Sequence, residues 1–188
     1  HLPLRWIDET QVTPIAQLAA GSEQQAEGEV LANEIAVRGR RQLLVRIADD
    51  SGELLLRFFH FYPSTRQQLA VGRRVRVYGP VRGGPMGLEI VHPRVHAAHA
   101  GEPLPQRLTP VYPSTEGVGQ AWLRARIGRA LRDVEITETV PAELLAATGL
   151  PPLAEAIAGL HQPPPGVDAA ALARQQGPWW ERIRFDEL

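Results

Sequence analysis

The chain has 188 residues, enough to bury a sizeable core in one domain or in two small ones. Hydrophobic residues make up 44% and charged residues 22%, as in ordinary globular proteins, and no apolar run approaches the roughly 20 residues that span a bilayer. Cysteine is absent, which excludes disulfides, thiolate metal sites and a cysteine nucleophile within the chain and fits a reducing cytoplasm.

All 20 basic residues are arginine. A Walker A loop and Schiff-base chemistry both require lysine, so neither can occur within this chain. The chain also begins with His1 rather than Met, and we interpret it as a piece of a longer protein.

The net charge of −1 hides an asymmetry along the chain. Residues 40–82 carry nine arginines and three acids, a net charge of +6, whereas residues 97–188 carry eight arginines and 11 acids, a net charge of −3. A basic middle between acidic ends indicates a local anionic partner.

In chain order, residues 1–25 read as a lead-in segment that packs on the domain that follows. A hairpin turn is predicted at Asp-Asp-Ser-Gly (49–52), a short helix at 63–72 and a tight turn at 82–87. Alternating apolar residues predict strands at residues 27–37, 42–48, 53–61, 73–81 and 88–95.

Three strands, a short helix and two more strands are the order of an OB-fold, a five-stranded Greek-key barrel. Other small barrels share parts of this order. We therefore predict a mainly β fold with some helix, in which residues 26–96 form the OB-fold domain.

After this domain the pattern becomes helical. Residues 96–110 are rich in Pro, Gly and Ala, which is typical of a linker, and residues 97–188 are predicted to form a Pro-rich linker and a small helical region. Its helices are expected at residues 118–134, 141–149, 151–161 and in a last stretch that ends at residue 188.

Catalytic patterns are missing from the sequence. None of G-x-S-x-G, H-E-x-x-H or G-x-G-x-x-G occurs. His92, His96 and His99 are clustered, but they lie on a strand that runs into coil, whereas a two-His metal site favours a helix. Asp49 and Asp50 are explained by turn geometry. We expect a binding module with no catalytic residues, no metal and no cofactor of its own.

An aromatic cluster lies in the third predicted strand and at its end. Alternation places Leu54, Leu56 and Phe58 on one face and Leu55, Arg57, Phe59 and Phe61 on the other. A charged Arg57 should face outward, which makes Phe59 an exposed ring beside an arginine. Exposed rings between arginines form a platform for single-stranded bases. The alternative is that a bulge turns Phe59 inward and that Phe61 closes the end of the barrel.

The predicted DNA-contacting residues are rings that would stack on bases and arginines that would meet phosphates. The alternative for each arginine is that it lies on a solvated face and does not contact DNA. The set comprises Phe59, Phe58, Phe61, Tyr62, Arg57, Arg46, Arg73, Arg74, Arg76 and Arg82.

Several segments together resemble the wedge domain of the bacterial RecG ATP-dependent DNA helicase family. They include RFF (57–59), AVGRRVRVYGPV (70–81), GLEIVHP (87–93) and LTPVYPSTEG (108–117), and the resemblance covers nearly the whole chain. The family usually has Asn in place of His60, and a basic tract in place of QQGPWWER (175–182). The resemblance assigns no role to Trp179 and Trp180, and packing made for the motor is an alternative that stays open.

This resemblance implies a remodeller of stalled replication forks and Holliday-type junctions in DNA repair and recombination. Its motor domains, with their ATP and Mg, would be absent here, and the wedge would split the strands at the branch point. Phe58 and Phe59 match the family's paired aromatics, and the outward-facing argument favours Phe59 as the stacking ring.

The expected partner is branched or single-stranded DNA, bound by a monomer in the bacterial cytoplasm at the nucleoid and away from any membrane. The resemblance also implies a second partner, the tail of single-stranded DNA-binding protein. An OB-fold that binds a peptide tail in place of DNA is the alternative function.

Overall fold

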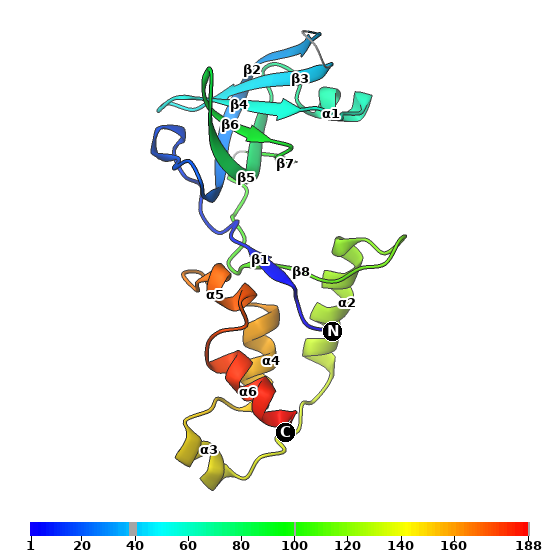
Figure 1. The fold of residues 1–188 in the computed structure, drawn as a ribbon. Helices are drawn as coiled ribbons and strands as arrows, with labels where there is room; N and C mark the ends of the chain where they lie inside the picture. Colours follow the sequence, from blue (N-terminus) through cyan, green and yellow to red (C-terminus); the bar gives the residue numbers. More distant parts are fainter. Residues whose placement is uncertain (38–40, 100, 188) are drawn as a thin grey trace. The chain divides into compact units, whose positions relative to one another are not determined.

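The structure is a computed structural model that describes residues 1–37, 41–99 and 101–187. The chain divides into two compact units (Figure 1). Residues 11–104 form a strand-rich unit, called the barrel unit, and residues 1–10 with 105–188 form a mainly helical one, called the helical unit. The lead-in segment predicted at residues 1–25 is therefore divided between the two units. Its first ten residues were expected to pack on the barrel, but they belong to the helical unit. The physical reason is backbone pairing of these residues with a segment about 100 positions later, which the local pattern does not reveal.

The barrel unit contains one short 3-10 helix, one α-helix and six strands among its described residues. In chain order they are η1 (Ile15–Gln17), β2 (Glu23–Ala36), β3 (Gln42–Ala48), β4 (Glu53–Phe58), α1 (Pro63–Gln68), β5 (Arg74–Gly84), β6 (Gly87–Val91) and β7 (Arg94–Ala97).

The strands close into a barrel because β2 pairs with two neighbours, β3 along its second half and β5 along its first half. The remaining order is β3-β4-β6-β5-β7, and only the β4–β6 pair is parallel. Gly28 is required where β2 passes from one partner to the other, since a Cβ there would come within 2.7 Å of the Ala48 carbonyl oxygen. The predicted OB-fold is confirmed.

Two strand predictions need correction. The third strand, expected to reach Phe61, ends at Phe58, because its partner β3 begins at Gln42 and the register pairs Leu43 with Phe58. The fifth strand, expected at residues 88–95, is two strands that part at His92 and Pro93. His92 has a left-handed φ of 50°, which ends β6, and β7 then pairs with β5 alone.

The core of the barrel unit is built from the inward positions of its strands, and the alternation predicted for β4 is correct. Leu54, Leu56 and Phe58 are buried together with residues from every other long strand. The fully buried members include Val30, Leu43, Val45, Ile47, Val77, Val81 and Ile90.

Over residues 1–10 and 105–187, the helical unit contains a two-stranded ribbon and five helices. Its elements are β1 (Arg5–Ile7), β8 (Thr109–Val111), α2 (Gln120–Asp133), α3 (Ala142–Thr148), α4 (Leu153–His161), α5 (Ala169–Ala173) and α6 (Pro178–Asp186). Trp6, Leu160, Leu172 and Trp180 form its buried core. No helix in the described part of the chain is long and apolar enough to cross a membrane.

The two adjacent tryptophans, to which the sequence assigns no role, both pack inside this unit. Trp180 is buried, and its indole N–H donates to the Leu172 carbonyl at 3.0 Å. Trp179 packs on the same core and lies directly over Gly159 of α4. Their contacts are supplied by α4 and α5 of this chain.

Candidate nucleic-acid interface

The outer face of the barrel carries alternating charged and apolar side chains in rows that cross four strands. Register places Arg46 of β3, Leu55 of β4, Glu89 of β6 and Arg82 of β5 in one row. The next row contains Leu44, Arg57 and Val91. Residues opposite one another on paired strands share a face, so Arg46, Arg57 and Arg82 lie on one surface.

Arg57 faces outward as expected, but it is held by its neighbours. Its Nε and Nη2 both donate to Oε2 of Glu89, at 3.0 and 2.7 Å, and its Nη1 donates to Gln42 Oε1 at 2.7 Å. Only 17% of the Arg57 side chain and 13% of the Glu89 side chain are exposed. Arg57 therefore links β4 to β3 and β6, and each of its three guanidinium nitrogens already donates a hydrogen bond within the barrel.

Arg74 and Arg76 lie on a different part of the barrel, where β5 pairs with β2. Each donates through Nε to Glu27, at 2.6 Å. Burial alone would raise the pKa of Glu27, but the hydrogen bonds from the two arginines outweigh it and lower that pKa below its ordinary value. These two arginines are thus not brought together with Phe59.

The other predicted arginines are exposed. Arg46 makes a 3.5 Å ion pair with Glu53, and both side chains are more than half exposed, so the pair contributes little stability. Arg73 and Arg82 make no ion pair with any described residue. Of the three, Arg46 and Arg82 lie on the outer face described above.

Phe59 stands at the end of β4 in a cluster of four rings. His92 is its centre, with ring centroids 6.0 Å from Phe58, 5.8 Å from Phe59 and 6.1 Å from His60. The Phe59 backbone N–H also donates to His92 Nε2 at 3.3 Å. The side chain of Phe58 is buried in the barrel core, whereas Phe59 is 36% exposed. The exposure of Phe59 thus arises at the strand end, with one edge of its ring supported by His92.

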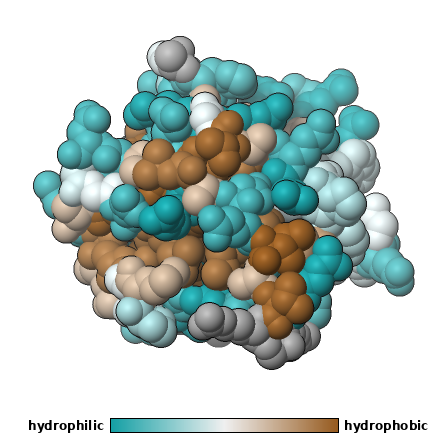
Figure 2. Space-filling view, turned by 90° about the horizontal axis from the view of Figure 1, so that it is seen from above, coloured by the Kyte–Doolittle hydropathy of each residue, from teal (hydrophilic) through white to brown (hydrophobic). Residues whose placement is uncertain are grey.

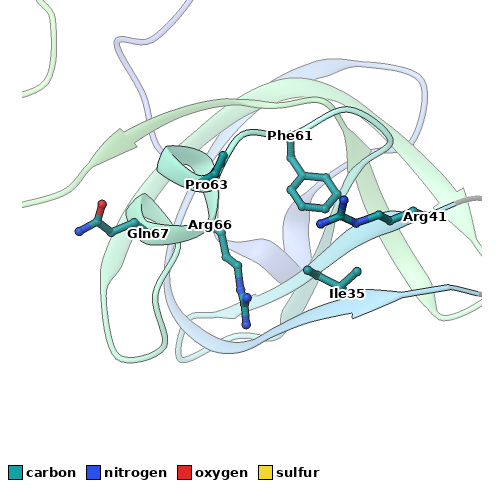
Figure 3. Close-up of a pocket in the computed structure, with 6 residues that line it drawn as sticks. All are labelled: Ile35, Arg41, Phe61, Pro63, Arg66 and Gln67. Carbon is teal, nitrogen blue, oxygen red and sulfur yellow. The ribbon is translucent and has the colours of Figure 1, made fainter.

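Phe61 turns back toward the barrel, which differs from its predicted place beside Arg57. It packs against the core, and the Arg41 guanidinium lies 5.1 Å from the centre of its ring (Figure 3). Together they wall a pocket of about 560 Å³, called the Phe61 pocket. Its lining residues are Ile35, Arg41, Phe61, Pro63, Arg66 and Gln67.

A second depression, of about 290 Å³, is also lined by Arg41 and Phe61. Phe59, His60 and Tyr62 complete its lining, and Tyr62 is 76% exposed. The two hollows share Arg41 and Phe61, so they form a continuous surface from Ile35 to Phe59. Figure 2 shows apolar side chains at the molecular surface in groups separated by hydrophilic ones, a mixture that suits both base stacking and phosphate contact.

Sequence reasoning missed Arg41, Arg66 and His92. Arg41 lies in the basic segment RGRR, but its contact with Phe61, 20 residues later, depends on the barrel closing. His92 was considered only as a metal ligand. No group of three His, Asp or Glu side chains in the described ranges could hold a metal ion.

Comparison with known proteins now identifies the region. A family model described as an OB-fold nucleic acid binding domain matches residues 25–97. The ATP-dependent DNA helicase RecG of Escherichia coli (strain K12) is 42% identical over 193 residues, covering 100% of this chain and 28% of the relative. RecG of Acidithiobacillus ferridurans is 37% identical, covering 100% of this chain and 27% of the relative.

Over its full length, the chain matches the wedge (OB-fold) region of RecG helicases. A solved structure described as RecG bound to a three-way DNA junction covers 99% of this chain and 25% of its own, with a TM-score of 0.65 at 21% identity, which supports the same fold. The chain spans little more than a quarter of the length of these RecG relatives.

Proposed function

We propose that this chain is the DNA-binding wedge of a RecG-type helicase, which holds branched DNA where its strands part. The observation that carries the proposal is the Phe59 ring at the end of β4, 36% exposed, in contact with His92 and in one depression with Arg41. The match to RecG over the full chain supports it, as does the printed description of the RecG structure as bound to a three-way junction.

The chemistry of the surface fits a branch point. A duplex that ends at a fork exposes the flat face of its last base pair, and an aromatic ring can cover that face at a gain of roughly 1–3 kcal/mol per stacked base. Phe59 supplies the ring, and Tyr62 stands near it on the same depression. One separated strand would follow the Phe61 pocket, where Arg41 and Arg66 would meet its phosphates.

Within this proposal, the strand splitting is driven by the parent protein. The parent would hydrolyse ATP with Mg in motor domains outside this chain, while the chain itself, without lysine, holds the branch and catalyses nothing. Stalled replication forks and Holliday-type junctions in DNA repair and recombination are the substrates we propose for it, in the nucleoid-containing cytoplasm of bacteria.

The test is a binding competition with the 188-residue chain at one fixed salt concentration. Phe59→Ala should weaken binding to a three-way fork about 5- to 100-fold and should weaken linear duplex binding much less. Tyr62→Ala should have a smaller effect in the same direction. Val71→Ala is the matched control, since Val71 is exposed in the barrel unit outside both hollows. Unchanged fork preference in both aromatic variants contradicts the proposal.

A second candidate function is favoured by the Phe61 pocket itself. Its two arginines and its apolar wall of Ile35 and Phe61 suit an acidic peptide with apolar side chains, such as the tail of single-stranded DNA-binding protein. If that is the main role, Arg66→Gln will abolish binding of the tail peptide and leave the affinity for the fork unchanged.

A further inference from the structure

Helix α2 differs in charge from the rest of the helical unit. Its 14 residues contain four arginines and one aspartate, a net charge of +3. The remainder of the unit contains five arginines and 11 acids, a net charge of −6. Helix α2 is therefore a segment of net positive charge in a unit that is otherwise net negative.

The positive charge of α2 surrounds an exposed tryptophan. Trp122 is 55% exposed, and the Arg126 guanidinium lies 5.5 Å from the centre of its ring. Positions 122, 126 and 129 follow the spacing i, i+4, i+7, so Trp122, Arg126 and Arg129 lie on one face of the helix. Arg129 pairs with Asp133 at 2.9 Å, but both side chains are more than half exposed and the pair is weak.

This outer face is distinct from the side of α2 that packs. Leu123, Ile127 and Leu131 are half-buried and share the opposite side, and no side chain of α2 is fully buried. The outer face holds only one large apolar side chain, Trp122, among charged ones. A face that docks permanently on another domain would need a broader apolar area, as permanent interfaces are mostly apolar.

We propose that the outer face of α2 binds single-stranded DNA, with a base stacked on Trp122 and phosphates held by Arg126, Arg129 and Arg132. The arginines favour a negatively charged ligand, and the exposed tryptophan ring favours one that carries flat groups, such as bases, that can stack on it. Duplex DNA does not fit this face, because its bases are stacked on one another and are not available to stack on Trp122. The helix from Trp122 to Arg132 is roughly 15 Å long, enough for two or three nucleotides.

This contact is independent of the barrel surface, and intrinsic fluorescence isolates it. All four tryptophans, Trp6, Trp122, Trp179 and Trp180, lie in the helical unit, and Trp122 alone among them is exposed. Stacking of a thymine on Trp122 should quench its emission. Titration of the 188-residue chain with a short oligothymidylate should therefore lower the tryptophan fluorescence in a saturable way.

Three variants test the assignment. Trp122→Ala should abolish the quenching and weaken oligothymidylate binding by this unit about 5- to 100-fold. In Arg126→Gln with Arg129→Gln, the slope of log K against the logarithm of the salt concentration should become less steep by about 0.7 for each lost phosphate contact. The control, Arg174→Gln with Arg184→Gln, makes the same charge change at exposed positions elsewhere in the unit. It should change neither the quenching nor the salt dependence of binding.

Phe59→Ala should leave the quenching intact, so failure of this inference and failure of the barrel proposal are separable. Absence of quenching by oligothymidylate, or an unchanged salt dependence of binding in Arg126→Gln with Arg129→Gln, overturns the inference. An acidic peptide that quenches as strongly as the oligonucleotide also overturns it, since α2 would then be a protein-binding surface.

Discussion

His92 packs against Phe59: the centroids of the two rings are 5.8 Å apart, and the Phe59 backbone N–H donates to His92 Nε2 at 3.3 Å. His92 reaches this place only because its own backbone is left-handed, with a φ of 50° that most residues avoid. A ring that is held in place before binding loses less entropy when a base stacks on it. The position of His92 therefore links the end of β6 to the proposed contact with DNA.

Replacing His92 by Asn keeps a residue that tolerates the left-handed backbone and removes the supporting ring. We expect the preference of the chain for a fork over linear duplex to fall about 3- to 10-fold, less than in Phe59→Ala, because the Phe59 ring remains but is no longer held. Fork competition at fixed salt measures this. An unchanged preference in His92→Asn means that His92 does not position Phe59.

Arg57 is expected to stabilise the barrel and to contribute little to phosphate binding. Arg57→Gln should lower the free energy of unfolding by about 2 kcal/mol, because it leaves Glu89 mostly buried without its partner. Glu89→Gln should cost a similar amount, and the double variant should show a coupling of about 1–2 kcal/mol. Hydrogen exchange of the β4 amides measures these changes. A variant that keeps its exchange protection but binds DNA with a weaker salt dependence would instead make Arg57 a phosphate ligand.

The helical unit should lose stability in mild acid because of His161. This side chain is buried and forms a 2.9 Å hydrogen bond with the Tyr112 hydroxyl. Burial lowers the pKa of His161 to about 4 from its ordinary value of 6.5, and it raises the pKa of Tyr112 to about 12. Between pH 6.5 and about 4 the unfolded state binds more protons than the folded state, so the free energy of unfolding falls as the pH falls through this window.

The loss should approach on the order of 3 kcal/mol at the acid end of the window. Urea unfolding followed by tryptophan fluorescence reports on this unit, since all four tryptophans belong to it. His161→Gln removes the titrating group, and its free energy of unfolding should depend less on pH across the same range. Parallel pH profiles for the two proteins would mean that His161 is not the cause.

Gly159→Ala should destabilise the helical unit by about 1–3 kcal/mol, although alanine favours a helix more than glycine does. An added Cβ would lie 2.3 Å from the Trp179 ring and would force the indole out of its place on α4. Gly128→Ala in α2 is the matched control, because its Cβ would find only ordinary contacts at 3.7 Å and beyond. Thermal unfolding should show a lower midpoint for the first variant alone, and equal midpoints for both would contradict this packing.

The sequence predicted the features that depend on local periodicity. Alternation correctly placed Leu54, Leu56 and Phe58 in the core and Arg57 outside it. It misplaced the end of β4, because Phe59, His60 and Phe61 retain a high strand propensity although the pairing of β4 with β3 stops at Phe58 and Leu43. A strand ends where its hydrogen-bonding partner ends, and a single strand's composition does not contain that information.

Long-range pairing explains the other differences. Arg57 meets Glu89 because β4 and β6 are parallel neighbours, and Arg41 meets Phe61 because the barrel brings the start of β3 against the segment before α1. Such contacts depend on register between strands far apart in the chain. The sequence thus shows that these residues are basic. Only the fold shows which arginines pair with Glu27 or Glu89 and which make no such pair.

We propose that the Phe59 ring covers the last base pair before the branch, and a fluorescent base at that position tests this contact most directly. A fork with 2-aminopurine in the last base pair should change its fluorescence when the 188-residue chain binds, and a base placed several pairs into the arm should not. Phe59→Ala, bound at saturating concentration, should lose the change, whereas Val71→Ala should retain it. A full fluorescence change in saturated Phe59→Ala would contradict the claim.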